Sequence, residues 1–380
     1  MKKLFFTTII IVSFSFLSGC AGSVYSQYRE IEQMKLIQLM GIDKAVEGGV
    51  QLSLASAGSK NNNDAPAILS GSGRSISSAL QRIRNYSGED AIFCAHVGHI
   101  LIGEEAARQD IDSILSYICH SSEIRVDLPV YVLSNSRAFD AMENSGNDKK
   151  GVVELIDSVH SSLSQRGESH VFTAAEIIRN IEKNGSALIC ALEFAPASES
   201  DTENTVAVHG YGIFKGYSLL QLMDRDNAVA VGFLINKVGI SDINVLDSKG
   251  NTVTLEIDGG STEIIPVWTE SGKLKGLDVE AKVSAAVLEI SGKSSDLDDP
   301  RYEDQLIAQL EAEISKRISS VLQLSKKLGA DFLDLSGRVE YASPKKYREN
   351  VSDFSYLLPE LEIQISVQGK LSHTYDIKDA

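Results

Sequence analysis

The stretch LDVEAKVSAAV, residues 277–287, decides how the second half of the chain folds. Its odd-numbered positions are all apolar. Its even-numbered positions are mostly polar and include Asp278, Glu280, Lys282 and Ser284. This period of two is typical of a β-strand that buries one face and exposes the other. The stretch therefore predicts an antiparallel or edge-containing sheet with one covered face.

A long helix is expected to follow that strand and to cover the sheet. Asp299 and Pro300 are a favourable N-cap and first helical residue, and Gly329 is expected to end the helix. At 1.5 Å per residue, a helix over 300–328 would be roughly 40 Å long. The residues expected to face the sheet recur at helical spacing and are Leu306, Leu310, Ile314, Ile318, Val321 and Leu328. A final strand is predicted at 361–367, where apolar and polar residues again alternate.

Helices and strands also alternate in the first half of the chain. The pattern predicts a helix over 71–87, a strand over 92–102 and a further helix from Glu104 to Ile118. Thr173 and Glu176 have the spacing of a capping box, so another helix is expected to begin there. Residues 219–236 are expected to be mostly helical.

These patterns predict a mixed α/β, or α+β, chain of several domains, each a mostly antiparallel or mixed sheet packed by helices. The polar stretch from Pro196 to Thr205 is the expected main domain boundary. The expected parts are an N-terminal α/β region at 28–195, a small middle α/β domain at 206–267, and a C-terminal α/β domain at 268–375 that contains the long helix.

Composition limits the classes of function. The chain has 380 residues, enough for two or three domains, and 43% of them are hydrophobic. Lys and Arg total 36 against 52 Asp and Glu, which gives a net charge of -16. Such a surface repels phosphate, so nucleic-acid binding and a polybasic membrane contact are disfavoured. Beyond residue 20, no apolar stretch approaches the ~18 to 20 residues needed to cross a bilayer.

The first residues indicate that the chain is exported. Lys2 and Lys3 precede an apolar run over 4–17, which is the pattern of a secretory signal peptide. The sequence LSGC at residues 17–20 then resembles the lipobox of bacterial lipoproteins, in which the Cys thiol receives a diacylglyceryl group before the chain is cut. The alternative is an ordinary signal peptide in which Cys20 occurs by chance.

A lipid on Cys20 would determine where the protein resides. Cleavage between Gly19 and Cys20 would remove residues 1–19 and leave 20–27 as a short tether. Two acyl chains anchor a protein stably, whereas one chain binds only marginally. The expected location is the outer face of a bacterial membrane, with Cys20 as the lipid-attachment residue.

No catalytic or cofactor-binding arrangement emerges from the sequence. Phosphate-binding glycine motifs, the GxSxG elbow and the HExxH zinc motif are absent. Cys94, His96 and His99 are possible metal ligands, but on one strand the first two would face away from His99. Cys94, Cys119 and Cys190 are odd in number and are expected to be buried free thiols. We therefore expect no enzyme activity, no metal and no cofactor beyond the lipid.

A series of motifs resembles the Ger(x)C family of spore germination lipoproteins, in the family's order and over nearly the whole chain. The motifs are the lipobox, Arg29–Glu32, Gly41–Lys44, Gly73–Ile76, His96 with Gly103–Glu105, Ser122–Arg125, Gly212–Gly216, Gly232–Lys237, Leu255–Ile257, the long helix, Asp331, Arg338 and Pro344–Tyr347. The chain departs from the family at Ala21-Gly22 and Ala95, where family members often have Trp-Asp and Gly. Tyr347 replaces a frequent Trp.

This resemblance implies the C subunit of a nutrient germinant receptor, built from three mixed α/β domains and without enzymatic activity. It implies a lipid anchor in the spore inner membrane. It also implies two partners, a large membrane subunit with soluble domains and a transporter-like multi-pass subunit. Two alternatives remain open. One is a solute-binding lipoprotein that captures the nutrient itself, and the other is a cell-wall hydrolase with an acid pair that sequence alone does not reveal.

Overall fold

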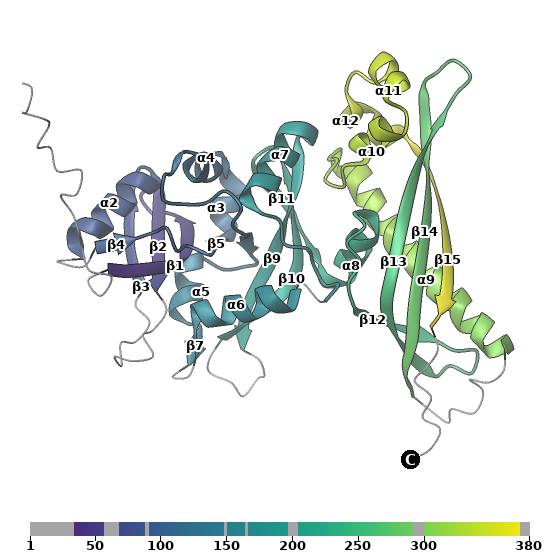
Figure 1. The fold of residues 1–380 in the computed structure, drawn as a ribbon, viewed down its shortest axis with the longest axis horizontal. Helices are drawn as coiled ribbons and strands as arrows, with labels where there is room; N and C mark the ends of the chain where they lie inside the picture. Colours follow the sequence, from purple (N-terminus) through teal and green to yellow (C-terminus); the bar gives the residue numbers. More distant parts are fainter. Residues whose placement is uncertain are drawn as a thin grey trace, which may run out of the picture.

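The computed structural model describes residues 34–56, 68–87, 91–147, 150–163, 166–196, 204–291 and 300–372. These residues form two large sheets that lie side by side, each packed by helices (Figure 1). The predicted α+β class is confirmed. None of the described helices is long and apolar enough to span a bilayer.

The first sheet has nine strands in the order β11-β10-β9-β6-β5-β1-β2-β3, with β4 also paired to β1. Its central pairs are parallel and its outer pairs are antiparallel. The strands are β1 Met34–Lys44, β2 Val50–Ser56, β3 Ile68–Gly73, β4 Ala91–Phe93, β5 His99–Ile102, β6 Val130–Leu133, β9 Ser186–Pro196, β10 Asn204–Lys215 and β11 Ser218–Asp224. Because helices cover both faces, β5 and β6 are buried along their whole length.

Helices on the two faces of this sheet form two separate cores. One core contains apolar residues of α2 (Ile76–Tyr86), α3 (Glu104–Gln109), α4 (Asp112–His120) and α7 (Ala174–Asn184). The other contains residues of α5 (Ala138–Glu143) and α6 (Val152–Leu163). A short hairpin, β7 (Gly146–Asn147) and β8 (Lys150–Gly151), precedes α6.

Local signals explain where several of these helices begin and end. The predicted capping box is present, since Thr173 and Glu176 bond each other's backbone N–H groups, and α7 ends at Gly185 with φ +64°. The helix expected over 71–87 begins only at Ile76, because the preceding glycines belong to β3. The strand expected over 92–102 is broken by a turn into β4 and β5, which pair with different parts of β1.

The second sheet has the order β12-β13-β14-β15 and is antiparallel except for the parallel pair β14 and β15. Its strands are β12 Ser241–Leu246, β13 Thr252–Trp268, β14 Leu274–Ile290 and β15 Glu362–Leu371. The helices of this part are α8 Arg225–Leu234, α9 Pro300–Leu328, α10 Leu335–Ala342, α11 Pro344–Asn350 and α12 Phe354–Leu357, followed by the 3-10 turn η2 Leu358–Glu360.

Helix α9 crosses one face of this sheet diagonally (Figure 1). It has the predicted bounds, and Gly329 ends it with φ +56°. Five of the six residues expected to face the sheet are buried, and Leu328 is half-buried. The odd-numbered residues of β14 from Leu277 to Ala285 are also buried, so the alternation predicted for this stretch is confirmed.

Other expectations also differ from the structure. The single helix expected from Glu104 to Ile118 is two helices, α3 and α4. Residues 219–236, expected to be mostly helical, divide into β11 and α8. The polar stretch from Pro196 to Thr205, expected as the main boundary, joins two antiparallel neighbours of one sheet, β9 and β10. The expected middle domain at 206–267 is therefore shared between the two sheets. Polar composition favours a connection between elements, but strand pairing decides whether the connection separates domains.

Replacing Leu310 by Ala tests the packing of α9. The residue is fully buried in the core between α9 and the sheet. We expect the L310A chain to lose about 2 to 5 kcal/mol of unfolding free energy, the usual cost of such a cavity. Denaturant unfolding measures the loss, and Gln309→Ala, on the exposed face of the same helix, is the control. Equal stability of the two variants would contradict the observed packing.

Candidate interaction surface

The predicted lipid-attachment site lies outside the described residues. Gly19, Cys20 and the tether at 20–27 all precede Met34, where the description begins. The lipid site therefore stays a prediction from sequence. The described residues show what the other motif residues do and which surfaces remain for a partner.

Asp43, in the motif at 41–44, serves the fold. Its two carboxylate oxygens accept hydrogen bonds from the backbone N–H groups of Ala138 (2.7 Å) and Phe139 (2.8 Å), at the start of α5. Burial raises the pKa of this carboxyl, while the two backbone bonds act to lower it. A side chain at Gly103 would collide with the same carboxylate. The motif thus holds β1 against the first turn of a helix.

Asp331 repeats this arrangement in the second half of the chain. Its carboxylate accepts hydrogen bonds from the backbone N–H groups of Leu335 (2.7 Å) and Ser336 (2.9 Å), at the start of α10. Burial raises the pKa of Asp331, and the hydrogen bonds from Ser336 are the main opposing influence. Two of the residues that carry the family resemblance are therefore buried carboxylates that bond the first backbone N–H groups of a helix.

The residues considered as metal ligands do not come together. Cys94 is buried, His96 is exposed, and His99 bonds elsewhere. Within the described ranges, no group of three or more Cys, His, Asp or Glu side chains could hold a metal ion. Cys190 is buried as expected, but Cys119 is exposed, because it lies on the solvent side of α4.

His99 is buried and belongs to a polar cluster between β5, β6 and α6, in which Asp157 is exposed. Its Nε2 lies 2.7 Å from Oδ1 of Asp157, and its ring packs edge-on against His160 at 5.2 Å between centroids. His160 Nδ1 lies 2.7 Å from the Tyr131 hydroxyl. Burial lowers the pKa of His99, although Asp157 opposes this shift. The bond between His99 and Asp157 attaches α6 to the sheet.

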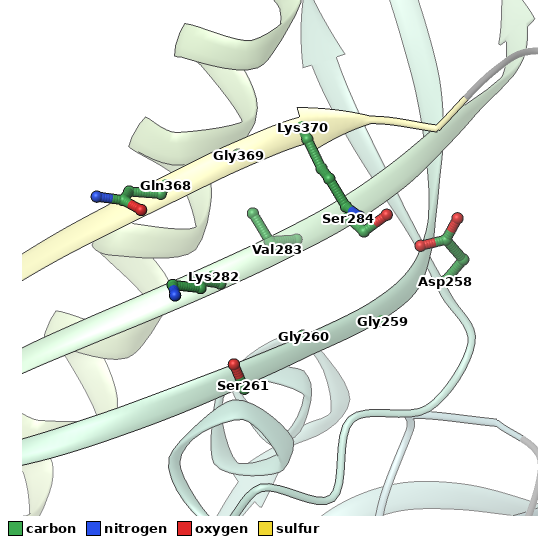
Figure 2. Close-up of a pocket in the computed structure, with 10 residues that line it drawn as sticks. All are labelled: Asp258, Gly259, Gly260, Ser261, Lys282, Val283, Ser284, Gln368, Gly369 and Lys370. Atoms are coloured by element: carbon green, nitrogen blue, oxygen red, sulfur yellow. The ribbon is translucent and has the colours of Figure 1, made fainter.

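The open face of the second sheet carries a hollow of about 640 Å³. It lies among the even-numbered residues of β14, on the side away from its buried residues. The lining residues are Asp258, Gly259, Gly260, Ser261, Lys282, Val283, Ser284, Gln368, Gly369 and Lys370. Figure 2 shows the Lys370 side chain extending from β15 towards Ser284 on β14.

Two adjacent glycines of β13 lie at this hollow and point to opposite faces of the sheet. A Cβ on Gly260 would collide with the ring of Phe233 in α8, so this position needs glycine for the sheet and helix to pack. A Cβ on Gly259 would meet nothing and would project into the open space. The two residues lie beside a bulge at Asp258, where β13 bends.

The charges around the hollow are arranged in two groups. Lys282 and Lys370 bring ammonium groups to it, and Asp258 accepts a hydrogen bond of 2.6 Å from the Ser372 hydroxyl. Hydrogen bonds from Ser372 and Ser284, together with the charge of Lys370, lower the pKa of Asp258. Further along the same face, Glu263 pairs directly with Glu280. This face therefore offers donors at the hollow and acceptors beyond it.

The shape and lining of the hollow suit contact with another protein surface. It is shallow, and it has no aromatic side chain, whereas enclosed sites for small molecules are mostly apolar and often aromatic. Sequence analysis identified Lys282 and Ser284 as exposed strand residues but missed the hollow. The parallel pairing that brings β15 beside β14 joins residues about 85 positions apart, and a local pattern does not show such a pairing.

Two family models match the chain one after the other. The first, described as a spore germination protein N-terminal domain, matches residues 27–194, and the second, described as spore germination B3/GerAC like, C-terminal, matches residues 209–375. The chain belongs to the Ger(x)C family of spore germination proteins. The two matched regions are separated by the polar stretch, although the nine-stranded sheet of this Ger(x)C chain continues across it.

A solved structure shares this fold. The crystal structure of the GerBC protein matches with a TM-score of 0.59 and 16% sequence identity, covering 88% of this chain and 97% of that one. No curated protein sequence matches the chain. For this Ger(x)C protein, the solved structure thus supports the fold, and the family models support a part in spore germination.

The buried state of His99 predicts a pH-dependent stability. Its pKa is lowered on folding, so protons bind more readily to the unfolded chain once the pH falls below about 6.5. The stability is present above that pH and is lost as the pH falls towards the folded pKa. We expect the unfolding free energy of His99→Gln to fall less than that of the wild type when the pH is lowered from about 7 to 5. Denaturant unfolding at each pH measures the difference.

The control for this prediction is His96→Gln, because His96 is exposed. It should leave the pH dependence of the wild type unchanged. The same pH dependence in His99→Gln and in the wild type would contradict the assignment of the effect to His99.

Proposed function

We propose that the chain is the C subunit of a nutrient germinant receptor, a non-catalytic, lipid-anchored subunit required for spore germination. The succession of both Ger(x)C family models along the chain is the observation that carries this proposal. The subunit scaffolds or relays the signal of two membrane partners, a large subunit with soluble domains and a transporter-like subunit. The buried motif carboxylates, which cap helices, are consistent with a role that needs no catalysis.

The lipid on Cys20 holds the protein at the outer face of the spore inner membrane. The charge balance supports a lipid as the means of attachment, because a chain with a net charge of -16 is repelled by anionic head groups. A stable anchor then requires acyl chains on the protein. The residues before Met34 connect this anchor to the folded body.

The open face of the second sheet is the surface that we assign to a partner subunit. The ammonium groups at the hollow attract acidic side chains, and the glutamates beyond it attract basic ones. Such an arrangement fixes the orientation of a partner more than it adds affinity. The same shallow lining argues against the alternative function, a solute-binding lipoprotein. Binding of a nutrient to the chain alone, measured by calorimetry, would reverse this ranking.

Replacing Cys20 by Ala tests the anchor. We expect the C20A chain to leave the membrane fraction and to support little nutrient-triggered germination, because it has no site for acyl chains. Cell fractionation and the loss of spore refractility in nutrient measure the two effects. Cys119→Ala, which removes an exposed thiol elsewhere, should behave as the wild type does. A C20A chain that remains with membranes and germinates normally would refute the lipid anchor.

Replacing Lys282 by Glu tests the partner surface. We expect severalfold less of the two membrane subunits to co-purify with the K282E chain. A negative charge at the hollow would repel the acidic partner side chains that Lys282 attracts. Lys345→Glu makes the same charge change on α11, away from the sheet face, and should not alter recovery. Equal recovery with both variants would place the partner contact on another surface.

A further inference from the structure

β15 is an edge strand of the second sheet, and part of its backbone is unpaired. The N–H of Ser372 donates to Ala285 on β14, so the even-numbered residues of β15 direct their backbone groups to β14. The odd-numbered residues direct theirs outwards, as the N–H of Gly369 confirms by donating to Glu311 of α9. Within the described residues, the outward groups of Ile363, Ile365 and Val367 have no hydrogen-bond partner.

The other long edge of the same sheet is partly protected. Beyond β12, the outward backbone groups of β13 at Thr262 bond the side chain of Asn236. Four residues further, the outward position is Pro266, which has no N–H to donate. β15 is ten residues long, has no proline and pairs with β14 without a bulge. Exposed edges of this kind are ready-made templates for another strand.

The sequence of β15 is complementary to itself when it runs antiparallel around Ser366. Glu362 then lies opposite Lys370 of the second strand, Gln364 opposite Gln368, and Ser366 opposite itself. All five of these side chains are exposed on the open face of the sheet. Opposite charges across a strand pair stabilise it, and like charges oppose it. The register centred on Ser366 therefore matches the charges and also pairs the two strands from Glu362 to Lys370.

We propose that two copies of this chain associate through antiparallel pairing of β15 with β15, centred on Ser366, to form one continuous eight-stranded sheet. In this register the outward groups of Ile365 face those of Val367 in the second copy, so the unpaired backbone groups bond each other. Gly369 lies opposite Ile363 of the second copy. The outward N–H of Gly369 already donates to Glu311 of its own chain. The central residues therefore supply most of the new hydrogen bonds.

This association is independent of the receptor assignment, since it needs neither the lipid nor a partner subunit. It is self-complementary, as a two-fold interface requires. The pairing also places Glu362 of one copy beside Lys370 of the other, which lines the hollow of its own chain.

Cysteine cross-linking in the full-length chain tests the register. The background carries Cys20→Ala and Cys119→Ala, and the two remaining cysteines, Cys94 and Cys190, are buried. Residues directly opposite at a non-hydrogen-bonded position have Cα atoms about 4.5 Å apart, within disulfide range. Ser366→Cys should therefore give a disulfide-linked dimer on mild oxidation. Gln364→Cys alone should not, since its copies would be about 13 Å apart at 3.3 Å per residue. The pair Gln364→Cys with Gln368→Cys should cross-link again.

Charge exchange provides a second test that leaves the fold unchanged. Lys370→Glu or Glu362→Lys alone should reduce cross-linking through Ser366→Cys severalfold, because like charges then face each other. The double exchange should restore it. Cross-linking of Ser366→Cys no greater than that of Gln364→Cys, or insensitive to these charges, would overturn the proposal.

Discussion

The packing of α9 across one face of the four-stranded sheet is the contact on which the second half of the protein depends. Parallel neighbours cannot be joined by a tight turn, so the chain must cross over between β14 and β15, and α9 is the main part of that crossover. The buried residues of α9 and of β14 form the core. Because α9 occupies only one face, the other face stays exposed, and β15 becomes the outermost strand.

Two buried carboxylates fix the starts of helices in the two halves of the chain. Asp43 and Asp331 each accept hydrogen bonds from two backbone N–H groups at the start of a helix. Asp43 lies on β1, far from its helix in the sequence, whereas Asp331 lies just before its helix. An uncompensated buried carboxylate would be costly, so these bonds are what allow burial. Because such motif residues stabilise the fold, the family resemblance predicts the fold. The contacts with other proteins depend instead on the exposed surfaces.

Prediction from sequence succeeded where the signal was local. α9 has its predicted bounds because a proline start, a glycine stop and a helical repeat all lie within the helix itself. The capping box at Thr173 is local in the same way. Residues 219–236 were expected to be mostly helical because the apolar run there suits a helix or a buried strand, and pairing with β10 decided for β11. Cys119 has apolar neighbours, yet the helix turns its side chain to solvent.

The sequence by itself indicated the family, the α+β class and the one-sided burial of 277–287, and it predicts an exported N-terminus with a lipid site at Cys20. The tertiary structure alone decided that β9 and β10 join one sheet across the polar stretch, that Lys282 and Lys370 share a hollow, and that β15 is an edge strand whose central backbone groups are unpaired. The physical reason is the range of the interactions. Side-chain periodicity and caps act within a few residues, whereas strand order and surface shape arise from pairing between residues far apart in the chain.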